Sequence, residues 1–252
     1  MRIHEFGKDN TKVILLIHPS LVTWDYFEYV IPYLEKDYHL LIPVIPGYDL
    51  SDDSDFSSVE EIAWELADDL QQRGIREVET MYGCSMGGSV VLRMAADGLV
   101  KAKNYVLDGG ITPYQLPWIM TRFIALRDFG MMALGKFGGE KLIVKAFSSS
   151  EFSEDDMKYL ANIFRHCTYK TLWNTFESCN NYRMPDRPMT FDGTVHYWCA
   201  EKETSERDWD LKYMREFVPG TVFKSFDGLS HGDMALFYPD MLAQELRSLS
   251  EG

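Results

Sequence analysis

The fold is decided within Val78-Glu79-Thr80-Met81-Tyr82-Gly83-Cys84-Ser85-Met86-Gly87-Gly88-Ser89-Val90-Val91-Leu92, where Gly-x-Ser-x-Gly stands between a strand-like and a helix-like segment. An abrupt turn from strand to helix presents the serine at its apex, and Gly83 and Gly87 remove the Cβ atoms that would clash there. The first amides of the following helix point toward the same space and can stabilise a negatively charged oxygen. The pattern indicates a nucleophilic Ser85. A Gly/Ser-rich turn with no catalytic role can have the same sequence, so the prediction depends on the rest of the chain.

Strands and helices alternate on both sides of this turn. Val13-Ile14-Leu15-Leu16-Ile17 is a continuous apolar run, typical of a strand buried on both faces of a parallel sheet. The other expected strands are 39–44, 77–82, 105–107, 194–199 and 221–226, and the expected helices are 24–35, 57–73, 86–97, 205–217 and 234–249. This order implies right-handed crossovers. We predict an α/β fold with a mostly parallel central sheet flanked by helices.

The alternation stops between residues 111 and 189, where the pattern is helical and rich in Met, Phe, Trp and Tyr. We interpret 111–189 as an inserted helical cap on a core made of 1–110 and 190–252. Such an insert suits a lid over a cleft, and it also suits an ordinary helical subdomain packed on the core. Trp118, Phe123 and Met131 are candidates to line a substrate pocket, although their spacing is equally typical of the cap's own core.

Composition excludes several classes of function. The 252 residues include 46% hydrophobic residues, enough for a substantial core, and the net charge of −14 argues against binding a nucleic-acid backbone or an anionic membrane surface. We see neither an apolar leader nor a run long enough to span a bilayer, and expect a cytoplasmic protein. Four scattered cysteines lack metal or redox spacing and are expected to be reduced core residues, Cys84 among them. No metal or cofactor is expected.

A nucleophilic serine needs a base, and the base needs an orienting acid. His231 lies in the loop that follows the strand ending at Phe226, and such loops gather at the carboxyl edge of a parallel sheet, where Ser85 also opens. Glu203, in the loop after the strand 194–199, is our choice of acid. Glu201 is close behind, and Asp108 at the end of the strand 105–107 reaches the same edge.

The oxyanion formed on a substrate needs two N–H donors. One is expected from the backbone of Met86, and the other from the loop after the first strand, His18-Pro19-Ser20-Leu21. Because Pro19 has no N–H, Ser20 or Leu21 must donate. His18 is expected either to act there or only to hold the loop by hydrogen bonding.

These residues together resemble the α/β-hydrolase family. Leu15 to His18 is similar to its strand ending in His-Gly, Pro46 to Ser51 to its Pro-Gly-x-Gly-x-Ser turn, Gly83 to Gly87 to its nucleophile elbow, Ala200 to Glu203 to its Gly-x-x-Asp acid loop, and Leu229 to His231 to its closing histidine. The resemblance covers nearly the whole chain outside the cap. It implies a serine hydrolase with a Ser85, His231 and Glu203 triad, acting on a small to medium, largely apolar ester, thioester or amide.

The chain departs from this family pattern at Pro19, Asp49 and Ala200, each of which replaces a glycine, and at Glu203, where aspartate is commoner. The Pro19 change bears on the oxyanion loop. It permits a second hypothesis, in which the same fold acts as a lyase or a carbon–carbon bond hydrolase. A third hypothesis, from another class of function, is a ligand-binding protein with a vestigial triad. In each case the expected partner is a small molecule.

Overall fold

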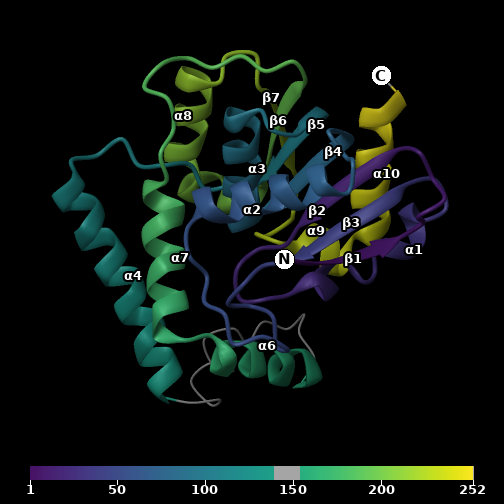
Figure 1. Cartoon of the computed structure of the whole chain (residues 1–252). Coiled ribbons are helices and arrows are strands. Elements are labelled where there is room, and N and C mark those ends of the chain that lie inside the picture. The colour runs from purple at the N-terminus through teal and green to yellow at the C-terminus, as the bar shows by residue number, and fades with distance from the viewer. Residues whose placement is uncertain (139–153, 252) are drawn as a thin grey trace.

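A seven-stranded sheet forms the centre of the molecule (Figure 1). The structure, a computed structural model, describes residues 1–138 and 154–251. The strand order is β1-β3-β2-β4-β5-β6-β7, with β1 antiparallel to β3 and the other neighbours parallel. The strands are β1 (Arg2–Phe6), β2 (Val13–Ile17), β3 (His39–Val44), β4 (Glu77–Cys84), β5 (Lys101–Asp108), β6 (Thr194–Ala200) and β7 (Val222–Phe226). The predicted α/β fold is therefore confirmed.

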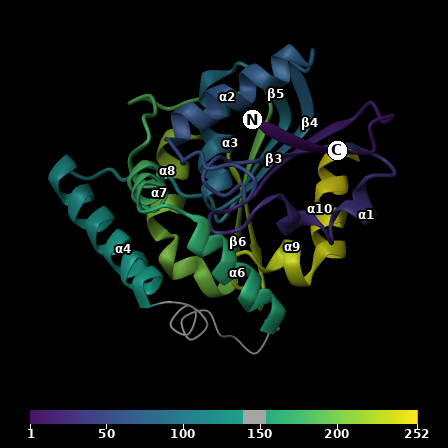
Figure 2. The same ribbon diagram turned by 60° about the horizontal axis from the view of Figure 1, so that its bottom comes forward.

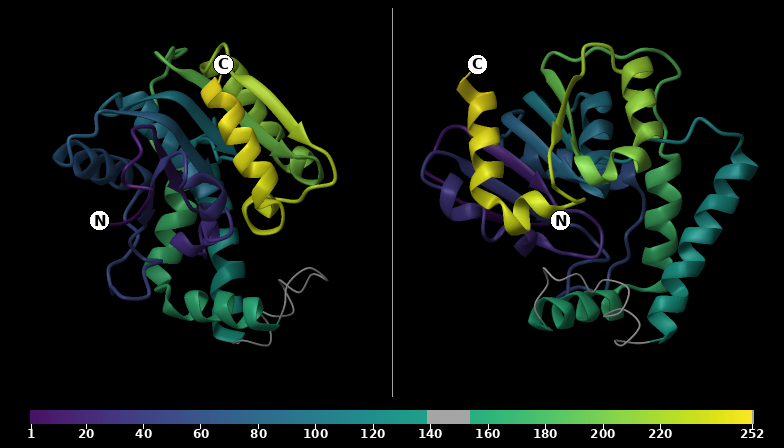
Figure 3. Two further views of the ribbon diagram at one scale, coloured as in Figure 1. Left: turned by 90° about the vertical axis from the view of Figure 1, so that its right-hand side faces the viewer. Right: turned by 180° about the vertical axis from the view of Figure 1, so that it is seen from behind.

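Helices cover both faces of this sheet (Figures 1 and 3). One layer contains η1 (Trp24–Phe27), α1 (Ile31–Leu34), α9 (Asp233–Phe237) and α10 (Pro239–Glu251), and the other contains α2 (Val59–Gln72), α3 (Met86–Asp97) and α8 (Asp208–Phe217). Along β2, Ile14 and Leu16 pack into the first layer while Leu15 and Ile17 pack into the second, and all four are fully buried. Because successive side chains of a strand point to opposite faces, this apolar run supplies two cores at once.

Between β5 and β6, the described residues form three helices: α4 (Trp118–Gly138), α6 (Glu154–His166) and α7 (Tyr169–Asn181). Figure 3 shows α4 beside α7, with α4 on the outside of the molecule. In Figure 2, α6 comes forward below the sheet, between α7 and α9. Helix α7 is bound closely to the core, since the hydroxyls of Thr171 and Ser178 accept the backbone N–H groups of Phe56 and Val59 at 3.1 and 2.8 Å.

The structure corrects three details of the sequence prediction. Strand β1 was not predicted, and it pairs with β3 at the edge of the sheet. The helix expected over 24–35 is two short pieces, η1 and α1. The helix expected over 234–249 is divided into α9 and α10 at Pro239, which begins α10 because proline has no N–H to donate within a helix. Among the described residues, no helix combines the length and apolarity needed to cross a membrane.

Candidate active site

Ser85 occupies a strained turn between β4 and α3. Its backbone has φ 52° and ψ −117°, a conformation rare for a residue with a Cβ. Glycine is required at both flanking positions because a Cβ there would collide with backbone atoms. A Cβ on Gly83 would lie 2.2 Å from the carbonyl oxygen of Gly87, and a Cβ on Gly87 would lie 2.2 Å from that of Ile17. The Gly-x-Ser-x-Gly letters therefore form a tight elbow here.

His231 and Glu203 form a close pair. The Nδ1 of His231 lies 2.6 Å from Oε2 of Glu203, and Glu203 as a whole residue is 3% exposed. The backbone N–H of Ala200 donates to its other oxygen at 3.1 Å. Burial works to raise the pKa of Glu203, but hydrogen bonding and charge from His231, followed by Arg207, lower it to about 2. Glu203 is therefore ionised at neutral pH and aimed at His231.

The peptide Asp108-Gly109 joins this pair to the serine. The N–H of Ser85 donates to the carbonyl oxygen of Asp108 at 2.8 Å. The next residue, Gly109, has φ +55°, and its Cα lies so close to the pair that a Cβ there would be 2.7 Å from His231 Nδ1 and 2.9 Å from Glu203 Oε1. The three residues predicted from sequence as a triad are thus gathered around one turn after β5.

The two alternative acids have other partners. The Asp108 carboxyl is buried and accepts a 2.5 Å hydrogen bond from the hydroxyl of Tyr82. Burial raises the pKa of Asp108 to about 6, against the opposing effect of the Tyr82 hydrogen bond. The exposed Glu201 accepts the N–H of Gly228 at 2.8 Å. The geometry therefore favours Glu203 as the partner of His231.

His18 holds the predicted oxyanion loop in place. Its Nε2 accepts the N–H of Ile45 at 3.2 Å, so Nδ1 carries the ring proton and donates to the carbonyl oxygen of Pro19 at 2.8 Å. Burial lowers the pKa of His18 to about 4, which keeps the ring neutral. Further along the loop, Leu21 has φ +65°. His18 thus fits the loop-holding role that the sequence left open.

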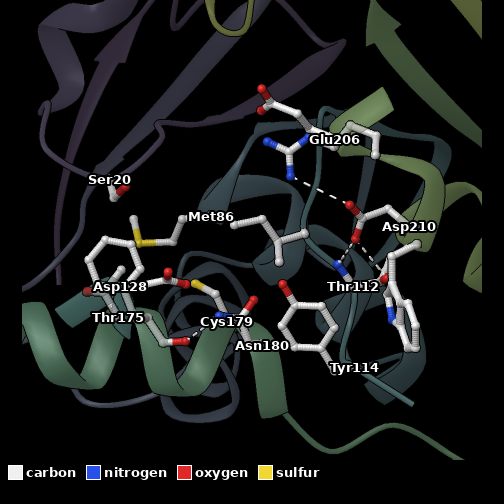
Figure 4. A pocket seen from close by; sticks show the side chains of 14 residues that line it. Ser20, Met86, Thr112, Tyr114, Asp128, Thr175, Cys179, Asn180, Glu206 and Asp210 are labelled. Carbon is white, nitrogen blue, oxygen red and sulfur yellow. Dashed lines mark hydrogen bonds and ion pairs between the residues drawn. The ribbon is translucent and has the colours of Figure 1, made fainter. Parts of the chain in front are cut away.

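A cavity of about 190 Å³ opens beside this loop (Figure 4). Ser20 and Met86, two of the expected oxyanion donors, lie on one side, and Thr112, Tyr114 and Asp210 lie on the other. The Met86 N–H is one of the first amides of α3, which have no acceptor within the helix. Leu21, the third expected donor, is not among the lining residues.

The cavity wall is more polar than the sequence suggested. Helix α7 supplies Thr175, Phe176, Cys179 and Asn180, and the remaining lining residues are Ile111, Asp128, Glu206, Arg207 and Trp209. Trp118, Phe123 and Met131, expected in the pocket, are 69%, 69% and 59% exposed on α4 and do not line it. The inward side of α7, and not these three side chains of α4, faces this cavity, so their role in a substrate pocket stays a prediction.

Two residues near the pair were missed in the sequence. Gly109 belongs to Asp108-Gly109-Gly110 after a strand, a signal for close backbone approach that was available. Arg207 follows Glu203 by four residues, and its Nε lies 2.9 Å from Glu203 Oε2. A charged residue in a polar segment gives no sequence signal of such burial. Within the described part of the chain, the acidic, cysteine and histidine side chains do not form a group of three or more that could hold a metal ion.

Comparison with known proteins agrees with this fold. The family model described as "Alpha/beta hydrolase family" matches residues 14–245. A solved α/β-hydrolase family protein from Desulfitobacterium hafniense is 23% identical, with a TM-score of 0.77 over 98% of this chain and 99% of that one. A thermophilic esterase from Thermogutta terrifontis is 14% identical, with a TM-score of 0.74 over 98% of this chain and 91% of that one. An epoxide hydrolase from Vigna radiata is 15% identical, with a TM-score of 0.74 over 99% of this chain and 93% of that one. At these identities the likeness shows the fold, and the solved structures differ in the bond their names say they cleave.

Proposed function

We propose, from the premise that this chain belongs to the α/β-hydrolase family, that it is a serine hydrolase of small carboxylic esters, thioesters or amides. The observation that carries the proposal is the 2.6 Å contact of His231 Nδ1 with Glu203 Oε2, beside the elbow of Ser85. A buried carboxylate on Nδ1 leaves Nε2 as the basic nitrogen of the ring. That arrangement is what a serine nucleophile requires of its base.

In the proposed reaction the Ser85 oxygen attacks the substrate carbonyl carbon while His231 accepts the hydroxyl proton. The oxyanion is stabilised by N–H groups of Met86 and Ser20, both at the cavity. The tetrahedral intermediate then expels the alcohol, thiol or amine, which takes the proton from His231 and leaves an acyl-serine. Water, deprotonated by His231, hydrolyses this acyl-enzyme and restores the free hydroxyl.

The cavity supports a small acyl group. Its volume of about 190 Å³ exceeds the roughly 150 Å³ that holds a six-membered ring and is below the roughly 300–1,000 Å³ typical of drug-sized sites. Met86, next to the nucleophile, lines the cavity, whereas Ser85 and His231 do not. Its mixed lining accommodates an apolar chain near Met86 and polar groups near Tyr114 and Asn180. We therefore prefer short-chain substrates to long, wholly apolar ones.

A fluorophosphonate probe tests the proposal. We expect one probe per molecule on Ser85, no labelling of Ser85→Ala, and unchanged labelling of Ser54→Ala, which alters an exposed-loop hydroxyl bonded only to Asp52 among the described residues. Hydrolysis of p-nitrophenyl acetate and butyrate should be lost in parallel in Ser85→Ala. A folded wild-type protein that neither labels nor hydrolyses either ester would refute the proposal.

A further inference from the structure

Arg207 connects the wall of the cavity to the His231–Glu203 pair. Its Nε lies 2.9 Å from Glu203 Oε2, the same oxygen that contacts His231 Nδ1 at 2.6 Å. Its Nη1 lies 3.5 Å from Asp210 Oδ2, and Asp210 Oδ1 in turn accepts the N–H and hydroxyl of Thr112 at 2.7 and 2.8 Å. The guanidinium is thus held in one place from two sides.

The surroundings of His231 are rich in carboxyl groups. Beside Glu203 from η2 (Glu201–Glu206), the charged and titratable groups that act on the pair are Arg207 between η2 and α8, Asp108 from β5, Cys84 from β4, and Tyr197 and Cys199 from β6. Behind them lie Asp210 from α8, which pairs with Arg207, Tyr82 from β4, which donates to Asp108, and Tyr26 from η1 with Asp233 from α9. Carboxylates close to an imidazole favour its protonated form, in which it cannot act as a base. The positive charge of Arg207 acts in the opposite direction.

We propose, on the basis of the proposed function, that Arg207 is a positioning residue. It shares the Glu203 carboxylate with His231 and thereby sets the lower limit of the pH range in which His231 works as a base. Two features of the contact support a role beyond folding. The guanidinium engages Oε2, the oxygen that also contacts the base, whereas the other oxygen, Oε1, accepts the N–H of Ala200. It is also little exposed, with 15% of its side chain accessible, so solvent screens its charge weakly.

The sign of the effect follows from the charges. Removing the guanidinium leaves the Glu203 carboxylate to His231 alone, so the imidazole retains its proton to higher pH. Removing the charge of Asp210 has the opposite sign, because a carboxylate near the pair is lost and Arg207 is left with Glu203 as its ion-pair partner. With the guanidinium and imidazole nitrogens on one carboxylate oxygen, an effect on the order of one pH unit is expected.

The test is the dependence of kcat/KM on pH, from about 5 to 9, with uncharged p-nitrophenyl butyrate, which reports the free enzyme. We expect the midpoint of the acidic limb to rise by about one pH unit in Arg207→Gln, to fall by a smaller amount in Asp210→Asn, and to stay near wild type in Arg207→Lys, which retains the charge. The control Arg215→Gln alters an exposed arginine of the neighbouring helix α8 and should leave the midpoint unchanged.

Each outcome decides a different question. A wild-type enzyme without labelling at Ser85 ends both the proposed function and this inference. A labelled, active wild type whose midpoint is unmoved in folded Arg207→Gln overturns the inference alone and makes Arg207 a structural residue only. Should Arg207→Gln fail to fold, Asp210→Asn decides, since it keeps the acceptor for Thr112, and a midpoint that is unchanged or raised overturns the inference.

Discussion

The substitution Gly109→Ala separates catalytic geometry from backbone strain. The added Cβ would lie 2.7 Å from Nδ1 and 2.8 Å from Cε1 of His231, and 2.9 Å from Oε1 of Glu203. Ordinary contacts of a Cβ are about 3.4 Å or longer, so both side chains must move apart by several tenths of an ångström. The 2.6 Å contact between them cannot then keep its present direction.

The size of the effect follows from two separate contributions. An alanine at the left-handed φ of +55° costs about 1 kcal/mol of stability. Losing the orienting acid altogether costs up to roughly 10⁴ in kcat, so a displaced but present carboxylate should cost about 10²–10³, or about 3–4 kcal/mol in the barrier. The backbone cost lowers the population of folded protein, whereas the displacement lowers the rate of the folded enzyme.

Gly98→Ala is the matched control. Gly98 ends α3 with φ +64°, and no atom lies within 4 Å of the position of its Cβ. It should carry the same backbone cost, a fall of about 2–4 °C in Tm for a chain of this size, with unchanged kcat. Steady-state hydrolysis and fluorophosphonate labelling of both variants, with thermal unfolding beside them, measure the difference. Wild-type kcat in folded Gly109→Ala would refute the placement of His231 and Glu203.

Two further predictions concern the carboxyl groups behind the serine. Glu203→Ala should lower kcat for p-nitrophenyl butyrate by about 10³ or more while Asp108→Ala retains most of its rate per folded molecule; the reverse result would assign the acid to Asp108. Asp108→Asn should raise the free energy of unfolding at pH 8 by on the order of 2 kcal/mol. The folded-state pKa of Asp108, raised to about 6 by burial, lies above the ordinary 3.8, so the stability that its protonated form contributes is present below pH 4 and lost as pH rises through 6. Thermal unfolding of wild type and Asp108→Asn at pH 4 and pH 8 measures this difference in stability. A stability gain in Asp108→Asn that is as large at pH 4 as at pH 8 would contradict the prediction.

Much of the site could be predicted because strand order places loops. Ser85, Glu203 and His231 come after β4, β6 and β7, and parallel strands bring the loops at their carboxyl ends to one edge of the sheet. The choice among neighbouring residues could not be predicted. Glu203 differs from Glu201 by the backbone turn of η2, which buries the first and exposes the second, and that turn leaves no composition signal.

Helices α4 and α7 show where hydrophobic periodicity fails to identify the buried face. Helix α4 exposes eight large apolar side chains and buries Thr121 and Ala125. When an apolar helix buries its small residues and exposes its large ones, hydrophobicity cannot identify the inward face. Helix α7 presents the opposite case, because Thr171, Thr175 and Ser178 are buried polar residues with partners in the core or in α7 itself. Buried polar side chains that hydrogen-bond to backbone groups far away in the chain cannot be recognised from the spacing of apolar residues.

For the proposed hydrolase, the position of Thr175 on α7 limits how the substrate range can change in evolution. The side chain lines the cavity, and its hydroxyl also shares a 2.7 Å hydrogen bond with the hydroxyl of Tyr48 in the core. A mutation there alters which groups fit in the cavity and at the same time leaves a buried tyrosine hydroxyl without its partner, at a cost of about 1–3 kcal/mol. New substrates reached through α7 therefore require stability in reserve, and lineages that exchange substrates are expected to acquire stabilising substitutions first.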